Sequence, residues 1–301
     1  MRKITKRSAA IAVAAVVAVG ATGAAWAAWS ITGTGKEILL WSKAWFEARG
    51  FRVLYGDTDS LFVSSGKEDA AGVREQGAQL ARDLNEELAR YIAERWRVTS
   101  RLSLKFEKLY LRLFLSRARH STRGASKRYA GLRQGPGGST GNGTNAVDGA
   151  SSGNVVEFVG MEVVRSDWTP LAKQVQRELY ERLFNDQPVD VYLADVVRRV
   201  RGGTLDDSLV YRKNLRKRAQ EYTATTPPHV AAARKSSQPP GRSVSYVMTT
   251  AGPEPIDNVQ HPLDREHYVQ KQVKPVAEPV LETLGLDFEL TVGDQGQLRM
   301  F

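Results

Sequence analysis

The sequence predicts an α+β fold in which an antiparallel sheet with covering helices is followed by a mainly helical second part. Short runs in which every second residue is apolar recur between residues 51 and 132. A long stretch at residues 68–96 has apolar residues at helical spacing, and the same spacing dominates after residue 169. Alternation with period two is typical of half-buried strands, and a period near 3.6 is typical of amphipathic helices.

The first elements are expected to be a helix, a hairpin and a second helix. Residues 36–49 have helical spacing, and Gly50 is a suitable stop. Strands are expected at residues 51–55 and 61–63, and Gly56 suits the turn between them. The long helix then presents one apolar face to the core, made of Leu80, Leu84, Leu88, Tyr91 and Ile92.

Four further strands complete the expected sheet. Alternation predicts separate strands at residues 102–106 and 109–115, and two more at 127–132 and 155–164 that pair across a loop. That loop, residues 133–154, contains seven glycines and almost no apolar residue, so it is expected to be a surface excursion without a catalytic role.

The second part is expected to begin with a capped helix. Thr169 and Pro170 form the cap and first turn, and Leu171, Val175, Leu179 and Leu183 follow as one stripe. A further helix opens at Pro188 and ends at Gly202 and Gly203. Next comes a basic cluster suited to phosphates, or alternatively a solvated charged face: Arg212, Lys213, Arg216, Lys217 and Arg218, extended by Arg234, Lys235 and Arg242.

Composition favours a polyanionic partner. Lys and Arg number 43 against 33 Asp and Glu, a net charge of +10, which suits nucleic acid or an anionic membrane surface. The absence of cysteine excludes disulfides, zinc–thiolate sites and a thiol nucleophile. The four histidines are scattered, and His261 and His267 are expected to be surface residues and not ligands.

The N-terminus has the features of a secretory leader or membrane anchor. Basic residues up to Arg7 precede an uncharged run at residues 8–35, whose apolar centre is 11–19. Ala25-Trp26-Ala27 is a candidate cleavage site. Because alanine dominates the run, it is weakly hydrophobic for a spanning helix. Residues 1–29 are therefore predicted to be a leader unrelated to the rest of the chain.

Two carboxylates form the most informative pattern in the chain. Asp57 and Asp59 stand two residues apart between strand-forming segments, so on extended backbone they would face one point. Oxygen ligands of this kind suit Mg²⁺ or Mn²⁺. The alternative is an Asp-rich turn that satisfies local backbone N–H groups.

A family resemblance favours the metal site. Tyr-Gly-Asp-Thr-Asp-Ser at 55–60 resembles the third palm motif of family B DNA polymerases. The segment 126–132, Ser-Lys-Arg-Tyr-Ala-Gly-Leu, resembles the family's Lys-Lys-Arg-Tyr segment, with Ser126 in place of the first lysine. Later segments at 160–172, 209–213, 227–230 and 252–255 narrow the resemblance to the bacterial polymerase II branch. It covers residues 30–301.

The resemblance implies roles for individual residues. Asp59 would bridge two magnesium ions with help from Asp57, and Lys127, Arg128 and Tyr129 would hold the primer end. Glu107 stands where the family often has a carboxylate beside the site. Among the basic cluster, the DNA contacts would be made by Arg212, Lys213, Arg216 and Lys217.

The resemblance also implies the organisation of the chain. Residues 30–165 would be a partial palm and 166–301 the thumb of a DNA-directed DNA polymerase in the nucleoid. The first palm motif, the fingers and the proofreading domain have no counterpart in residues 1–53, so the chain is expected to be inactive alone. Implied partners are primer–template DNA, deoxynucleoside triphosphates, a second chain that supplies the missing parts, and a sliding clamp. The alternatives are a non-catalytic DNA-binding module and an exported or membrane-tethered polycation binder.

Overall fold

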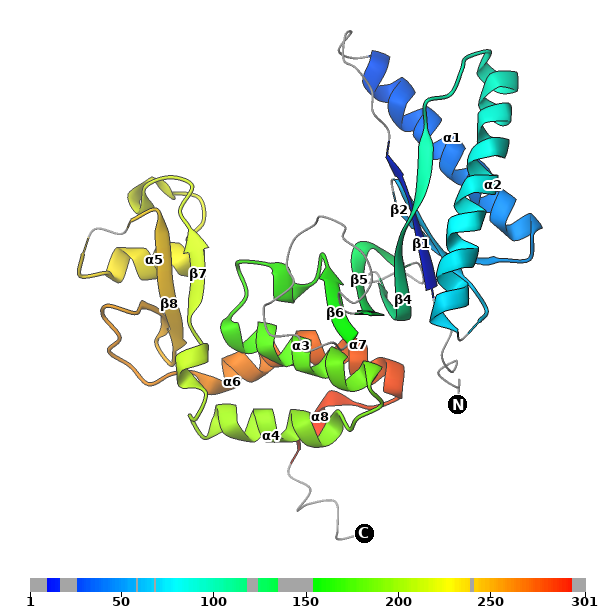
Figure 1. Ribbon diagram of the computed structural model, residues 1–301. Coiled ribbons are helices and arrows are strands. Elements are labelled where there is room, and N and C mark those ends of the chain that lie inside the picture. The colour runs from blue at the N-terminus through cyan, green and yellow to red at the C-terminus, as the bar shows by residue number, and fades with distance from the viewer. Residues whose placement is uncertain are drawn as a thin grey trace. The chain divides into compact units, whose positions relative to one another are not determined.

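Two compact units make up the chain. The computed structural model describes residues 10–16, 26–57, 59–67, 69–117, 124–134, 154–238 and 241–293. The units divide between Glu157 and Phe158, whereas the sequence placed a boundary between residues 165 and 166. Each unit combines helices with antiparallel strands, which confirms the predicted α+β class (Figure 1). The division falls inside a strand, so the chain passes directly from one unit into the next.

The first unit is built on a six-stranded sheet. The paired strands in it run antiparallel, from the β2–β3 hairpin at one edge to the long β4–β5 pair. The spatial order is β2-β3-β1-β4-β5-β6. The strands are β1 (Ala10–Val16), β2 (Arg52–Asp57), β3 (Ser60–Ser64), β4 (Ser103–Arg117), β5 (Gly124–Gln134) and β6 (Asn154–Val159).

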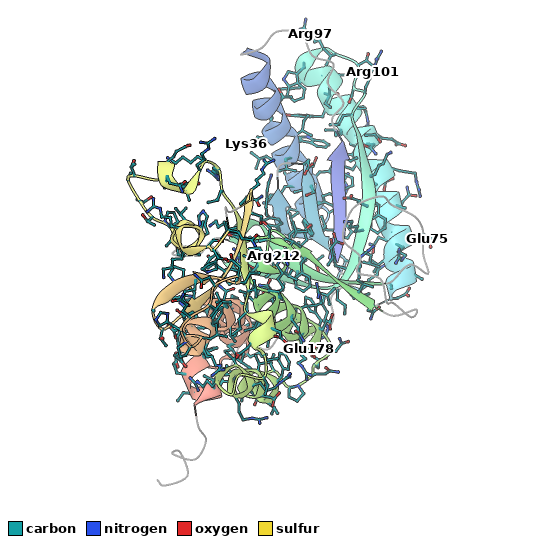
Figure 2. The ribbon with its side chains drawn as sticks, turned by 90° about the vertical axis from the view of Figure 1, so that its left-hand side faces the viewer. Lys36, Glu75, Arg97, Arg101, Glu178 and Arg212 are labelled. Atoms are coloured by element: carbon teal, nitrogen blue, oxygen red, sulfur yellow. The ribbon has the colours of Figure 1, made fainter. Side chains whose placement is uncertain are left out.

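Two helices, α1 (Trp26–Ala48) and α2 (Ala70–Trp96), lie against the sheet of this unit (Figure 1). Asp69 caps α2 by accepting hydrogen bonds from the amides of Ala71 and Gly72. Figure 2 labels Glu75 near the N-terminal end of α2 and Arg97 and Arg101 beyond its C-terminal end. The core between helices and sheet contains Trp45, Phe46, Leu61, Val63, Val73, Leu80, Leu84, Leu88, Ile92, Leu104 and Leu109.

A β-bulge explains why one prediction about the strands is wrong. Residues 102–106 and 109–115 were expected to be two strands, but both lie in β4. Opposite β1, Glu107 is an extra residue between Phe106 and Lys108. An extra residue shifts the alternation by one position, so Leu104 and Leu109 both face the helical core although their numbers differ in parity. The break in the sequence pattern is therefore a bulge within one strand.

The strands β5 and β6 lie side by side, as predicted. The expected strand at 155–164 ends early, because Gly160 adopts a positive φ of 62° and the turn η1 (Glu162–Val164) follows. Most of the glycine-rich loop between the two strands lies outside the described residues.

The N-terminal segment contributes a strand to this sheet. Residues 10–16, inside the predicted leader, form β1 between β3 and β4 and pair with both. The candidate cleavage site falls at the start of α1, which begins ten residues before the helix expected at 36–49 and ends as predicted ahead of Gly50. Among the described residues, no helix has the length and apolar character needed to cross a membrane. Leader function stays a prediction.

The second unit is mainly helical and carries a three-stranded sheet in the order β7-β8-β9. Thr169 caps its first helix by accepting from the amide of Ala172, and Pro170 is the first helical residue, as predicted. The helices are α3 (Pro170–Phe184), α4 (Asp190–Arg201), α5 (Pro228–Lys235), α6 (Arg265–Tyr268), η4 (Val269–Val273), α7 (Lys274–Leu284) and α8 (Phe288–Val292), and the strands are β7 (Tyr211–Asn214), β8 (Ser243–Thr249) and β9 (Gly252–Pro255).

A buried polar network fixes the start of α3 in this unit. The Gln176 side chain accepts from the amide of Val163 at 2.7 Å and donates to Glu162 Oε2 at 2.8 Å. The Gln272 Oε1 atom accepts from both the amide and the hydroxyl of Thr169. These buried polar groups are hydrogen-bonded, as an interior requires, so the network ties η1, α3 and η4 together.

We expect the substitution Gly131→Ala to destabilise the first unit. A Cβ on Gly131 would lie 2.5 Å from Cε1 of Tyr110, a side chain that is only 1% exposed and has no room to move. Overpacking of this kind costs about 1–3 kcal/mol. The midpoint of urea unfolding should fall accordingly. Gly35→Ala is the control, because nothing lies within 4 Å of that position in α1; an alanine there should stabilise the helix by about 0.5–1 kcal/mol. Equal stability of both variants would contradict the packing argument.

Candidate metal hairpin and nucleic-acid interface

The two predicted metal ligands lie at the tip of the β2–β3 hairpin. Asp57 is the last residue of β2 and pairs with Ser60, the first residue of β3, and Asp59 lies in the turn that joins the two strands. Asp59 is exposed in that turn. The expectation that both aspartates stand on extended backbone is therefore wrong for Asp59, because the turn and not the strand pleat directs its side chain. The side chain of Asp57 lies outside the described part of the structure.

Gly56 has a different role from the one predicted. It is not in the turn but within β2, where it pairs with Leu61. A Cβ at this position would lie 3.1 Å from Cδ2 of Leu61 and 3.9 Å from Cδ2 of Leu39. The tight contact is with Leu61, its partner on β3, so the glycine leaves room for this side chain within the hairpin.

The donor set at the tip fits a weakly held divalent cation. Carboxylate oxygens are the ligands that Mg²⁺ prefers, and Mg²⁺ usually keeps several waters when one or two carboxylates bind it. Within the described residues, no group of three or more His, Cys, Asp or Glu side chains is close enough together to hold a metal. Of the two predicted ligands, the described side chain is that of Asp59, and water or further groups would complete its ligand shell.

An aromatic cluster supports the hairpin from behind. Tyr55 and Phe62 stand on the two hairpin strands with ring centroids 5.5 Å apart. The ring of Tyr129 on β5 packs edge-on against Phe62 at 5.1 Å, and Tyr110 on β4 stacks on Phe62 at 6.0 Å. Phe62 and Tyr110 are fully buried. Because one set of rings contacts β2, β3, β4 and β5, the hairpin is held against the basic segment of β5.

A hydrogen bond links the two sequence motifs directly. The amide of Lys127 donates to the hydroxyl of Tyr55 at 2.6 Å, across 72 residues of sequence. Lys127 has φ = 58°, in the left-handed region that a non-glycine residue rarely adopts. It is exposed, while Arg128 and Tyr129 are half-buried. The structure thus brings three predicted DNA-binding residues close to the predicted metal hairpin. No pattern in the sequence indicated that Tyr55 would link them.

The electrostatic environment of Tyr129 involves the carboxylate predicted beside the site. Burial raises the pKa of Tyr129 to about 12, and the negative charges of Glu157 and Glu107 act in the same direction. Glu107 is exposed in the bulge of β4. Its charge reaches Tyr129, so Glu107 lies near the aromatic cluster, and at neutral pH Tyr129 presents a neutral hydroxyl.

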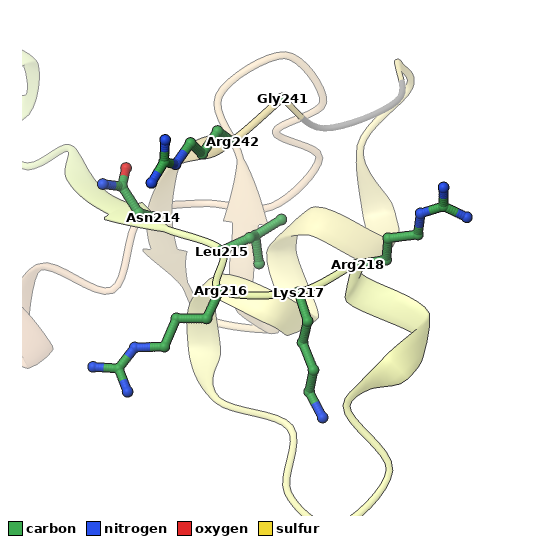
Figure 3. Close-up of a pocket in the computed structure, with 7 residues that line it drawn as sticks. All are labelled: Asn214, Leu215, Arg216, Lys217, Arg218, Gly241 and Arg242. Carbon is green, nitrogen blue, oxygen red and sulfur yellow. The ribbon is translucent and has the colours of Figure 1, made fainter.

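The predicted basic cluster occupies a separate site in the second unit. Arg212, Lys213, Arg216, Lys217 and Arg218 are exposed on β7 and the segment after it; Figure 2 labels Arg212. Residues of this segment line an open pocket of about 780 Å³ together with Gly241 and Arg242 (Figure 3). None of these six cations has an ion pair within the described part of the chain. We call them the basic notch.

The backbone of the basic notch is fixed although its cationic ends are not paired. The amide of Leu215 donates to the carbonyl of Arg242 at 2.8 Å, and the amide of Arg216 donates to the Tyr222 hydroxyl at 3.1 Å. The Lys217 ammonium lies 4.8 Å from the centre of the Tyr222 ring. In Figure 3 the charged ends of Arg216, Lys217, Arg218 and Arg242 point apart. Diverging charges suit several phosphates along a polyanion better than one small anion.

Two of the three residues predicted to extend the cluster have structural roles instead. Arg234 donates to the carbonyls of Ala219 and Tyr222 and to the Thr226 hydroxyl, so it closes the loop that precedes α5. Lys235 donates to the carbonyl of Pro253 at 3.1 Å. Of the three, only Arg242 lines the pocket of the notch. It directly precedes β8, and its carbonyl accepts a hydrogen bond from the residue that follows β7.

The histidines described by the structure interact with protein groups. His261 is exposed, as predicted, and its Nδ1 lies 2.5 Å from the buried carboxylate of Glu254. His267 is half-buried instead, and its Nε2 lies 3.0 Å from the Tyr211 hydroxyl. Burial lowers the pKa of His229 and of His267. His120 lies outside the described residues.

Comparison with known proteins gives one consistent family. The model of DNA polymerase family B matches residues 16–283. The chain is 39% identical over 286 residues to DNA polymerase II of Escherichia coli, covering 90% of this chain and 34% of that protein. It is 30% identical over 275 residues to DNA polymerase 2 of Aeropyrum pernix, and the alignment covers 85% of this chain and 28% of that protein. The solved structure of the family B DNA polymerase from Pyrobaculum calidifontis superimposes with a TM-score of 0.53 at 29% identity. The superposition covers 86% of this chain and 30% of that one. The chain spans about a third of the length of these relatives.

We expect Tyr55→Phe to loosen the segment at Lys127 while leaving the ring packing in place. The variant keeps the phenyl ring but leaves the Lys127 amide without its acceptor, at a cost of about 0.5–1.5 kcal/mol. Hydrogen exchange at the Lys127 amide should accelerate, and the unfolding midpoint should fall slightly. Tyr222→Phe, which removes the acceptor of the Arg216 amide in the other unit, is the matched control and should leave exchange at Lys127 unchanged. Unaltered exchange at Lys127 in Tyr55→Phe would show that this bond does not hold the segment.

Proposed function

Because this chain belongs to DNA polymerase family B, we propose that it is the C-terminal palm and thumb portion of a DNA-directed DNA polymerase of the polymerase II type. The observation that carries the proposal is the bond from the Lys127 amide to the Tyr55 hydroxyl. It places the carboxylate hairpin and the segment 127–129 together in one unit, as a reaction between a primer end and a nucleotide requires.

The proposed reaction is attack of a primer 3′-hydroxyl on the α-phosphate of a deoxynucleoside triphosphate, with pyrophosphate leaving. Asp59 and Asp57 would hold Mg²⁺ or Mn²⁺, and the bound ions, two in a complete enzyme, would neutralise the charge on the phosphates. Lys127 and Arg128 would contact the primer backbone. Tyr129 would offer a neutral hydroxyl, which a tyrosine has at physiological pH and which burial keeps protonated to a still higher pH.

The basic notch supports a second step of the proposal, which is DNA binding in the thumb. Six cations without ion pairs in the described part of the chain, on a fixed backbone, form a surface that attracts a polyanion. Within the basic notch, Arg212 and Lys213 stand on β7, directly before the residues that line the pocket. The cationic surface therefore continues along the strand. The proposed partners are primer–template DNA, deoxynucleoside triphosphates in a complete enzyme, a second chain, and a sliding clamp in the nucleoid.

A non-catalytic DNA-binding module is the second candidate. It is supported by one observation: the basic notch lies in the second unit, whereas the carboxylate hairpin belongs to the first. Primer extension distinguishes the two candidates, because both predict DNA binding and only the first leads to nucleotide incorporation once the missing parts are added.

We expect the isolated chain not to polymerise. About two thirds of its relatives' length lies outside the matched region, and phosphoryl transfer depends on positioning and charge neutralisation by a complete set of groups. Incorporation of labelled nucleotide on a primer–template with Mg²⁺ or Mn²⁺ should equal that of a no-protein control, while E. coli DNA polymerase II extends the same primer. Template-directed incorporation that Asp59→Ala abolishes would contradict this expectation.

DNA binding should persist and should weaken steeply with salt. Each phosphate contact contributes about 0.9 to the slope of log K against log salt concentration, so the double substitution Arg216→Ala and Lys217→Ala should flatten the slope by about two. The matched control removes Arg198 and Arg199, two exposed cations of α4 that pair with Asp195. This control should change the slope less. Fluorescence anisotropy over a salt series gives both slopes, and an affinity independent of salt would refute DNA binding by the notch.

Metal binding at the hairpin should be weak and should depend on Asp59. Two adjacent carboxylates repel each other, and a single cation relieves this repulsion only in part. Titration with Mn²⁺ should broaden amide signals near residues 56–61, and Asp59→Ala should abolish the broadening with DNA affinity almost unchanged. Asp83→Ala, which removes a half-buried carboxylate of α2 far from the hairpin in sequence, should leave the broadening intact. Broadening that survives in Asp59→Ala would show that the hairpin is not the metal site.

A further inference from the structure

The strand β1 occupies the interior of the sheet although it comes from the N-terminal end of the sequence. It pairs with β3 through residues 10–14 and with β4 through residues 10–16, antiparallel on both sides. On its β3 side, Ala14 pairs with Ser60, the first residue of β3, which directly follows Asp59. If β1 left the sheet, the inner edges of β3 and β4 would both lose their hydrogen-bond partners. Unpaired strand edges of this kind accept another strand.

β1 is also the one strand of this sheet that lies almost entirely outside the family match. The match begins at residue 16, whereas β2, β3, β4, β5 and β6 all fall inside it. The relatives are about three times as long as the aligned segment. The matched part of the fold therefore forms a sheet with one internal position that residues before the match fill in this chain.

The composition of β1 suits its replacement by another strand, because β1 carries no polar or charged side chain that its neighbours could recognise. Its sequence, Ala-Ile-Ala-Val-Ala-Ala-Val, carries no charge and no polar side chain. Its specific contribution is the double row of backbone hydrogen bonds, and any extended apolar segment can supply such bonds when it adds to an open sheet edge. The hairpin strands β2 and β3 also pair with each other, so these hydrogen bonds do not depend on β1.

We propose that the position between β3 and β4 is a strand-accepting site, which β1 fills in the isolated chain and which an extended apolar segment of a second polypeptide takes over. The partner is a polypeptide that carries the part of a family B polymerase outside the region matched here. This step rests on the proposed function for the identity of the partner, but not for the existence of the site. Exchange at this position would deliver the partner's residues next to Asp59.

A disulfide lock tests whether β1 must leave. The chain has no cysteine, so the double variant Ala10→Cys and Ser64→Cys introduces a single pair at directly opposed positions of β1 and β3. Opposed residues of antiparallel strands have a Cα separation of about 4.5–5.5 Å, which suits a disulfide. Oxidation should give an intramolecular crosslink. The matched control, Ala10→Cys with Ser60→Cys, places the second cysteine at the partner of Ala14 and should not crosslink.

Exchange is then measured on the full chain with defined probes. The first is a fluorescent peptide with the sequence of residues 8–17, flanked by lysines for solubility. The others are overlapping peptides of about 15 residues, long enough for one strand, that tile the part of E. coli DNA polymerase II outside the aligned region. We expect the first peptide and at least one of the tiled peptides to bind the reduced chain at least about tenfold more tightly than the locked chain, and reduction to restore binding.

The outcomes separate this inference from the proposed function. Equal binding of all peptides to locked and reduced protein, or no binding, would overturn the strand-accepting site whatever the result of the DNA-binding assay. Exchange of the first peptide without any tiled peptide would overturn the identity of the partner. Oxidation to a disulfide-linked dimer, seen by size-exclusion chromatography, would show that a second copy of this chain is the occupant and would overturn it as well.

Discussion

The short strand β3 is the constraint on which the first unit depends. Both of its edges are paired, to β2 and to β1, and both of its faces are buried. Leu61 and Val63 face the helices, while Phe62 faces the aromatic cluster. A five-residue strand held on four sides cannot shift by one residue, because such a slip would move its apolar side chains to the opposite faces. The position of Asp59, directly before β3, follows from this fixed register.

The groups proposed for chemistry and the basic notch proposed for DNA binding belong to different units. The hairpin, the segment 127–129 and Glu107 all belong to the first unit, where Phe62 and Tyr129 pack together. The basic notch belongs to the second unit, where a small sheet fixes the backbone. The two sets of residues lie in different units, so a substitution in the core of one unit is expected to leave the backbone of the other in place.

Features that depend on local sequence could be predicted well. The cap at Thr169 and Pro170, the stop of α1 ahead of Gly50 and the apolar face of α2 each follow from a few neighbouring residues. The basic notch was also foreseen, because clustered cations close in sequence remain close in space. The family resemblance was carried by residues 55–60, and the comparisons confirmed it.

Local sequence predicted the fold class, the family and the helix ends that carry a cap or a glycine stop. Only the tertiary structure decided that β4 is one strand, because the bulge at Glu107 depends on pairing with β1. The tertiary structure also shows that Tyr55 reaches Lys127, that Arg234 donates to the loop before α5, and that residues 10–16 join the sheet. The physical reason is common to all four. Each finding depends on hydrogen bonds between segments that are distant in sequence, or on which of several acceptors a side chain contacts. Such interactions produce no periodic pattern in the sequence.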